Sequence, residues 1–146
     1  MKIALAQIKP FKGNIPVNLA LHEKWIQLAI KHQANLIVFP ELSMTGYEPT
    51  LAKALAINAS DQRLEIFQTL SNQHQIIIGI GLPIKKAKGI YIGLLFFHPQ
   101  QPRQLYTKKY LHADEVPFFK EGQNDALLIG ETSIAPAVCY ELSIPT

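Results

Sequence analysis

Three short segments of this 146-residue chain end in side chains that can take part in acid–base or covalent chemistry. Glu41 lies in FPELSMTGY, Lys108 in LYTKKYL and Cys139 in IAPAVCYEL, and each follows an apolar run that favours a β-strand. A carboxylate can accept a proton, an ammonium group can stabilise developing negative charge, and a thiolate is a nucleophile. Because ligand-contacting residues gather at the carboxyl ends of strands in α/β sheets, these positions suit an active site.

Each of these residues, taken alone, also fits a plainer structural role. Glu41 can occupy a surface turn, Lys108 can be a solvated charge at a strand end, and Cys139 can be a small core residue. A cysteine at a turn from strand to helix differs from a buried core cysteine, because the amides at a helix N-terminus lower the thiol pKa and make the sulfur nucleophilic. Cys139 precedes a segment that we expect to begin a helix, so both interpretations of the cysteine stay open.

The predicted elements that must position these residues run β-α-β-α and then continue as several strands. Apolar residues at helical spacing predict a helix over residues 16–33 and a second over residues 61–73, which Ser60 or Asp61 can cap. Several strands are apolar on both faces, so we expect helices on one face of the sheet and another apolar layer on the other. The strand at 76–81 should be central in the sheet, and hairpin turns are expected at 85–89 and 98–102. The expected strands are 2–8, 35–39, 76–81, 90–97, 103–107, 126–129 and 133–138.

The composition, with 48% hydrophobic and 17% charged residues, is typical of one globular domain. The net charge is +3, but the basic residues are spread along the chain, so their pattern does not predict nucleic-acid binding. No apolar stretch reaches the ~20 residues that span a bilayer, and the first residues lack the apolar core of a signal peptide. Cys139 is the single cysteine, which excludes an internal disulfide and a multi-cysteine zinc site. We therefore expect a cytoplasmic protein that binds neither nucleic acid nor a membrane.

Taken together, the three segments resemble the motifs of the carbon–nitrogen hydrolase (nitrilase) superfamily. The residues stand in the order Glu, Lys, Cys with spacings of 67 and 31, and the resemblance runs from MKIALAQI to VCYELSIP. The family's catalytic lysine stands three residues before a leucine, which selects Lys108 rather than Lys109. A second glutamate of the family falls on Glu115, in ADEVPFFKEG, rather than on Glu121. Tyr110 stands where the family commonly has histidine.

The resemblance implies a thiol-based hydrolase that cleaves a non-peptide C–N bond in an amide, carbamoyl or nitrile substrate. Cys139 would be the nucleophile that forms a covalent thioester-type intermediate, and Glu41 would be the general base. Lys108 and the backbone N–H of Tyr140 would stabilise the oxyanion, and Glu115 would support Lys108 or the substrate amine. The implied reaction requires neither a metal nor an organic cofactor, and the resemblance favours a small-molecule amide over a nitrile.

The resemblance also implies an α/β fold that is half of a four-layer αββα sandwich, truncated after the nucleophile elbow. Residues 1–146 would form a carbon–nitrogen hydrolase domain that is incomplete at its C-terminus. The inner apolar face of the sheet would then be exposed, which favours a homo-oligomer or association with a missing second half. The alternative is a catalytically inactive remnant, or an assembly partner that pairs through its open sheet.

Overall fold

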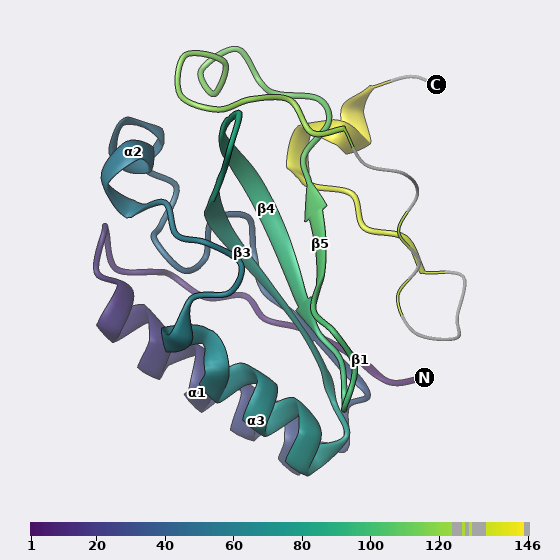
Figure 1. The fold of residues 1–146 in the computed structure, drawn as a ribbon. Helices are drawn as coiled ribbons and strands as arrows, with labels where there is room; N and C mark the ends of the chain where they lie inside the picture. The colour runs from purple at the N-terminus through teal and green to yellow at the C-terminus, as the bar shows by residue number, and fades with distance from the viewer. Residues whose placement is uncertain (124–126, 128, 130–133, 145–146) are drawn as a thin grey trace.

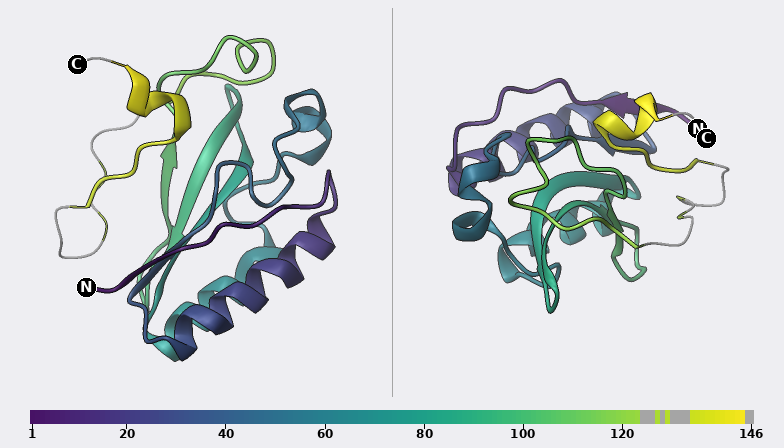
Figure 2. Two further views of the ribbon diagram at one scale, coloured as in Figure 1. Left: turned by 180° about the vertical axis from the view of Figure 1, so that it is seen from behind. Right: turned by 90° about the horizontal axis from the view of Figure 1, so that it is seen from above.

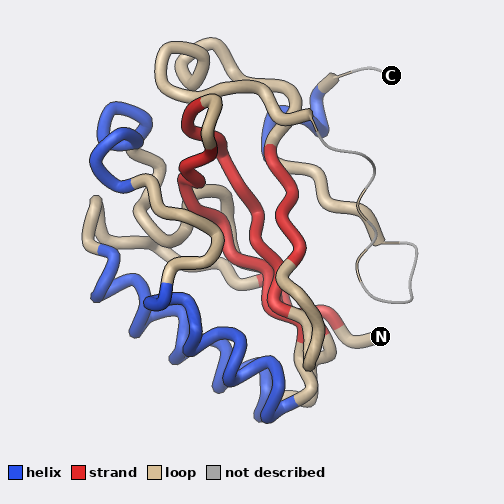
Figure 3. The backbone as a smooth tube through the Cα atoms, viewed as in Figure 1, coloured by secondary structure: helices blue, strands red, loops and turns tan. Residues whose placement is uncertain are grey.

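A five-stranded mixed sheet forms the centre of the computed structural model, which describes residues 1–123, 127, 129 and 134–144 (Figures 1 and 3). The order across the sheet is β1-β2-β3-β4-β5, in which β1, β2 and β3 are parallel and β3, β4 and β5 are antiparallel. The predicted central strand and both predicted hairpins are confirmed. The strands are β1 (Ile3–Leu5), β2 (Leu36–Val38), β3 (Ile77–Lys86), β4 (Gly89–Phe97) and β5 (Gln104–Thr107).

Two long helices, α1 (Ile15–Lys31) and α3 (Glu65–His74), lie side by side against one face of the sheet (Figures 1 and 2). They confirm the helices predicted over 16–33 and 61–73. A single helical turn, α2 (Ala52–Leu55), follows the loop after β2. None of the described helices has the length and apolar character needed to cross a membrane.

The helices and the sheet enclose the main core. Asp61, one of the two residues predicted to cap the second helix, caps the 3-10 turn that precedes α3. Its carboxylate accepts the backbone N–H of Arg63. The apolar side chains between helices and sheet are almost fully removed from water, which is the dominant stabilising contribution to such a fold. They include Ile26 of α1, Phe67 of α3, and Ile78, Ile80 and Leu82 of β3.

The opposite face of the sheet carries a second apolar cluster. Ile92, Leu94 and Phe96 of β4 are at most 7% exposed, because they pack with Val138 of the C-terminal segment and with Phe119 of the preceding loop. The expectation that this inner face is exposed is therefore wrong for these residues. Large exposed apolar side chains lie instead at the edge strand β1, where Leu5 is 81% exposed.

Two predicted strands differ from the structure. The strand predicted at residues 2–8 is limited to β1, because its partner β2 ends at Val38, whose carbonyl accepts the last pairing hydrogen bond from Ala6. The segment predicted as a strand at 133–138 forms one bridge, from Ile134 to Ile129, and residues 135–138 are unpaired in the described structure. Pro136 explains this, since proline has no N–H to donate to a ladder. Of the strand predicted at 126–129, residues 126 and 128 lie outside the described residues, as does residue 133.

Candidate active site

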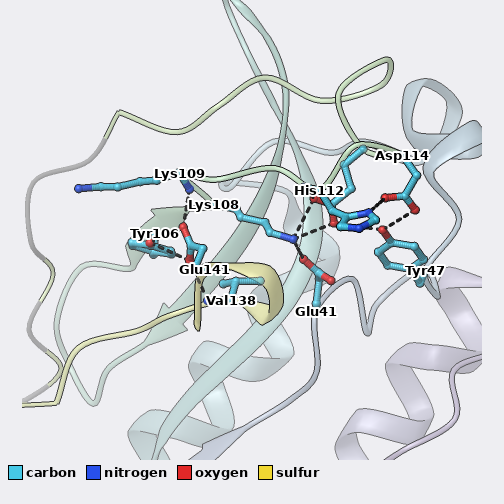
Figure 4. Close-up of polar contacts among 10 residues, drawn as sticks. Glu41, Tyr47, Tyr106, Lys108, Lys109, His112, Asp114, Val138 and Glu141 are labelled. Carbon is cyan, nitrogen blue, oxygen red and sulfur yellow. Dashed lines mark hydrogen bonds and ion pairs between the residues drawn. The ribbon is translucent and has the colours of Figure 1, made fainter. Parts of the chain in front are cut away.

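Lys108 is the first residue after β5, and its ammonium group is buried between two carboxylates. Its backbone N–H donates to the carbonyl of Ile92 at 2.9 Å, which continues the β4–β5 pairing by one residue. Its Nζ lies 2.7 Å from Oε1 of Glu41 and 2.7 and 2.9 Å from the two carboxylate oxygens of Glu115 (Figure 4). Burial alone would lower the pKa of Lys108, but the hydrogen bonds and charges of the two glutamates raise it. Lys109 extends away from both carboxylates (Figure 4).

Glu41 lies in a turn that follows β2 and rests on the central strand. The backbone N–H of Met44 donates to the carbonyl of Gly81 in β3 at 2.9 Å. A Cβ at position 81 would lie 2.2 Å from the carbonyl oxygen of Pro40, so only glycine permits this close approach. Burial raises the pKa of Glu41, while the hydrogen bond and charge of Lys108 act in the opposite direction. A carboxylate with a raised pKa is suited to accept and return a proton near neutral pH.

A buried polar network holds the same turn from the helix side. The ring of His22 in α1 makes hydrogen bonds through Nδ1 to the carbonyl of Asn18 at 2.7 Å and through Nε2 to Oγ of Ser43 at 2.9 Å. Because a carbonyl can only accept, Nδ1 carries the proton and Nε2 accepts from the Ser43 hydroxyl. Burial lowers the pKa of His22 to about 4, so the ring is neutral at pH 7. This network anchors the turn that carries Glu41.

Glu115 is almost completely buried, with a side chain only 1% exposed. Besides Lys108, its carboxylate accepts the backbone N–H of His112 at 2.7 Å and the hydroxyl of Tyr47 at 3.1 Å. The Tyr47 hydroxyl also lies 3.0 Å from the carboxylate of Asp114. The sequence analysis did not select Tyr47, although it ends the same segment that contains Glu41.

Cys139 stands at a sharp turn between extended and helical backbone. Val138 is extended, and Cys139 has a φ of +48°, a left-handed conformation that is rare for a residue with a side chain. Cys139 opens a 3-10 helix, Cys139–Ser143, and lines a cavity of about 490 Å³ together with Glu41 and Tyr47. The cavity therefore brings a thiol and a carboxylate together.

The electrostatic surroundings of the Cys139 thiol favour its protonated form. Desolvation and the negative charge of Glu41 raise the pKa of Cys139, and they outweigh the charge of Lys108 and the backbone N–H of Tyr140, which lower it. The amide of Tyr140, at the start of the helix, thus lowers the thiol pKa, but burial and the charge of Glu41 raise it by more. The helix that Cys139 opens is a short 3-10 helix, and the negative charge of Glu41 acts more strongly on the thiol than the positive charge of Lys108. The raised pKa keeps the Cys139 thiol protonated at rest, beside the Glu41 carboxylate in the cavity that the two residues share.

The structure thus gathers the residues that the sequence analysis selected. Glu41, Lys108 and Glu115 are in direct contact, Cys139 shares the cavity with Glu41, and Tyr140 directly follows Cys139 in the chain. Two side chains that were not selected, Tyr106 and Glu141, meet beside this group (Figure 4). Among the residues described, no cluster of three His, Cys, Asp or Glu side chains has the arrangement of a metal site.

Known proteins resemble the chain in both sequence and structure. The glutamine-dependent NAD(+) synthetase of Acinetobacter baylyi is 36% identical over 88 residues, which cover 60% of this chain and 16% of that protein. The corresponding synthetase of Aquifex aeolicus is 21% identical and is matched by 99% of this chain over 26% of its length. The chain therefore spans only a minor part of these relatives.

Solved structures resemble the fold over almost the whole chain. A CN-hydrolase superfamily protein from Xanthomonas campestris matches 98% of this chain with a TM-score of 0.87 and 20% identity, over 54% of its own length. An amidase from Nesterenkonia sp. matches 96% of the chain with a TM-score of 0.81 and 24% identity, over 56% of its length. The predicted nitrilase-like α/β fold is confirmed. The carbon–nitrogen hydrolase family model matches residues 2–146, and the chain belongs to the carbon–nitrogen hydrolase family.

Proposed function

We propose that this chain carries the catalytic residues of a hydrolase that cleaves the C–N bond of a small neutral amide through the thiol of Cys139. The observation that carries the proposal is the buried Lys108 ammonium, held between Glu41 and Glu115 beside the cavity that Glu41 shares with Cys139. Keeping a lysine and two glutamates out of water costs several kcal/mol per ion before their mutual attraction. Such an arrangement is typical of functional sites rather than of folding.

In the first step, Glu41 takes the proton of the Cys139 thiol while the sulfur attacks the amide carbon. The carbonyl electron pair moves to oxygen and forms a tetrahedral oxyanion. The positive charge of Lys108 and the backbone N–H of Tyr140 stabilise this oxyanion. The raised pKa of the Cys139 thiol means that proton removal accompanies attack, rather than producing a stable thiolate beforehand.

In the second step, the protonated Glu41 returns its proton to the amide nitrogen, the C–N bond breaks and ammonia or an amine leaves. A thioester on Cys139 remains. A water molecule then gives a proton to Glu41 and attacks the thioester carbon. Collapse of the second oxyanion returns the proton to the sulfur and releases the carboxylic acid. Glu41 acts as base and acid twice, and its raised pKa supports both roles.

The cavity supports a neutral, partly apolar substrate. Among its described lining residues, Glu41 is the one charged side chain, and much of the remaining wall is apolar, including Val38, Phe39, Leu94 and Val138. An acyl group without charge suits such a wall, since an unpaired charge would lose hydration there. L-glutamine is a second candidate, because the matched synthetases are described as glutamine-dependent.

Ammonia release from acetamide, propionamide, butyramide and L-glutamine by the intact protein tests the proposal. We expect turnover of at least one simple amide, with the acyl-enzyme visible by intact mass on Cys139. Cys139→Ala should abolish turnover, and Lys108→Met should reduce it at least ~100-fold, because transition-state charge stabilisation is lost. Lys109→Met is the matched control and should leave turnover nearly unchanged.

Two outcomes would contradict the proposal. Equal losses in Lys108→Met and Lys109→Met would refute the assignment of the catalytic lysine. Absence of both turnover and acyl-enzyme on every amide, in protein that is folded by circular dichroism, would favour the inactive alternative.

A further inference from the structure

Glu141 is bound from three directions by groups that lie next to the proposed catalytic residues. Its Oε1 accepts the backbone N–H of Lys109 at 2.5 Å, and its Oε2 accepts the backbone N–H of Val138 at 2.7 Å. The hydroxyl of Tyr106 lies 2.8 and 2.9 Å from the two oxygens (Figure 4). Burial and Glu141 raise the pKa of Tyr106, so its hydroxyl keeps its proton and donates. Each carboxylate oxygen of Glu141 therefore accepts a backbone N–H, and the Tyr106 hydroxyl lies within hydrogen-bond distance of both.

The two backbone donors belong to segments that are far apart in the sequence. Lys109 directly follows Lys108 at the end of β5, and Val138 directly precedes Cys139. On the β5 side, Lys108 is also held by its hydrogen bond to Ile92 of β4. Residues 135–138 have no strand partner in the described structure, so the elbow lacks an equivalent ladder. The carboxylate of Glu141 joins the elbow to the end of β5 by hydrogen bonds, in addition to the apolar packing of Val138.

The backbone of the elbow makes this connection more important. The left-handed φ of Cys139 is energetically unfavourable for a residue with a side chain, and it persists only where surrounding contacts hold it. Glu141 supplies such a contact one residue before Cys139, and its own backbone N–H donates to the Val138 carbonyl at 3.1 Å. Glu141 thus holds Val138 at both its N–H and its carbonyl.

We propose that Glu141 is a positioning residue that sets the separation between the Cys139 thiol and the Lys108 ammonium group by fixing Val138 and Lys109 to one carboxylate. It acts through these neighbours and does not touch the substrate. This inference rests on the function proposed above, because it assigns Glu141 to the same reaction.

Glutamine at position 141 would break this arrangement with little change in shape. An amide has one acceptor oxygen, and its NH₂ group cannot accept a hydrogen bond. Glu141→Gln must therefore leave the N–H of either Lys109 or Val138 without its partner. Tyr106→Phe removes one donor to Glu141 but leaves both backbone anchors, so its effect should be smaller. Glu121→Gln makes the same chemical change at an exposed residue and is the matched control.

The experiment compares these variants by steady-state kinetics, by thermal unfolding, and by the pH dependence of Cys139 alkylation with iodoacetamide. We expect Glu141→Gln to lower kcat roughly 10–100-fold, because a displacement of about 1 Å at reacting groups costs of that order. KM should change less than about threefold, since substrate contacts are kept. The alkylation midpoint should shift towards that of the protein unfolded in urea. Tyr106→Phe should lower kcat about 3–10-fold, the equivalent of one hydrogen bond, and Glu121→Gln should match the wild type.

A Glu141→Gln protein that is folded, less heat-stable, and unchanged in both kcat and alkylation midpoint would overturn the inference, since Glu141 would then serve only stability. If Glu141→Gln does not fold, an unchanged Tyr106→Phe would overturn it instead. The alkylation measurement needs no turnover. Failure of the proposed function, seen as no hydrolysis by the wild type, is therefore distinguishable from failure of the positioning role.

Discussion

Replacing Lys108 with methionine should destabilise the protein far more than the same change at Lys109. Methionine keeps most of the length of the lysine side chain but removes its charge. Lys108 has no exposed side-chain surface, and its ammonium group lies 2.7 Å from the carboxylates of both Glu41 and Glu115. Those carboxylates are only 11% and 1% exposed, so water cannot replace the lost cation.

The size of the effect follows from this burial. Removing one partner of a buried ion pair leaves an uncompensated charge and costs about 3–5 kcal/mol. The total stability of a domain is about 5–15 kcal/mol, so this is a large fraction of it. At about 2–4 °C per kcal/mol for a chain of this size, the unfolding midpoint should fall by roughly 6–20 °C. Lys109→Met should cost less than about 0.5 kcal/mol, because its side chain lies away from the site (Figure 4).

The loss of folding stability in Lys108→Met should also depend on pH, and it should increase as the pH rises. Lys108 is the group that restrains the raised pKa of Glu41, so removing it raises that pKa further above the ordinary 4.5. An acid whose folded-state pKa is raised contributes stability below its unfolded pKa, and that contribution is lost as pH rises through the folded value. The deficit of Lys108→Met relative to the wild type should therefore be larger at about pH 8 than at about pH 5.

Urea unfolding at both pH values, followed by circular dichroism, measures this deficit. Adding Glu115→Gln to Lys108→Met should recover part of the stability, because one of the two unpaired carboxylates is removed. Equal destabilisation by Lys108→Met and Lys109→Met, or a deficit that does not change with pH, would refute the argument that Lys108 is a charged residue paired inside the fold.

Three further predictions address the thiol and the turn that carries Glu41. The pH midpoint for iodoacetamide alkylation of Cys139 should lie higher in the native protein than in urea, and a lower native midpoint would contradict the raised pKa. Gly81→Ala should cost about 1–3 kcal/mol in urea unfolding and lower amidase turnover, because its Cβ would displace the Glu41 turn. The pKa of His22 is lowered from 6.5 to about 4, so protonation of its buried ring should destabilise the protein as the pH falls through this range. The free energy of unfolding should fall by about 3 kcal/mol. A His22→Gln protein with an equally steep loss would exclude His22 as the cause.

The sequence predicted the elements and the principal site residues because their signals are local. Helical spacing of apolar residues, β-branched runs and turn residues lie within single segments, and they determined the two long helices, the central strand and the two hairpins. Glu41, Lys108 and Cys139 were selected because each follows an apolar run and because their order resembles a known family. In the structure, Glu41 and Cys139 line one cavity, and Lys108 donates a hydrogen bond to Glu41.

Hydrogen bonds between segments that are far apart in the sequence could not be predicted from such local signals. The proton acceptors of Tyr47 and Tyr106 are 68 and 35 residues away in the chain, and no periodicity in the sequence indicates such distant partners. The direction of the Cys139 pKa shift was left open by the sequence for a related reason. It depends on the burial of the thiol and the proximity of Glu41, which only the folded arrangement defines. The exposed inner face was wrongly expected because the packing of Val138 and Phe119 against β4 could not be foreseen.

The buried triplet of charges also bears on the release of product. Two carboxylates, Glu41 and Glu115, and one ammonium, Lys108, leave one net negative charge beside the cavity. A neutral amide meets no repulsion on arrival, whereas the carboxylic acid formed by the proposed reaction is ionised at neutral pH. Two like charges about 4 Å apart repel by about 1–4 kcal/mol between bulk water and a protein surface. For the proposed reaction, we therefore expect the neutral amide to bind more readily than the ionised acid, and inhibition by the acid should strengthen only when the pH is low enough to neutralise that acid.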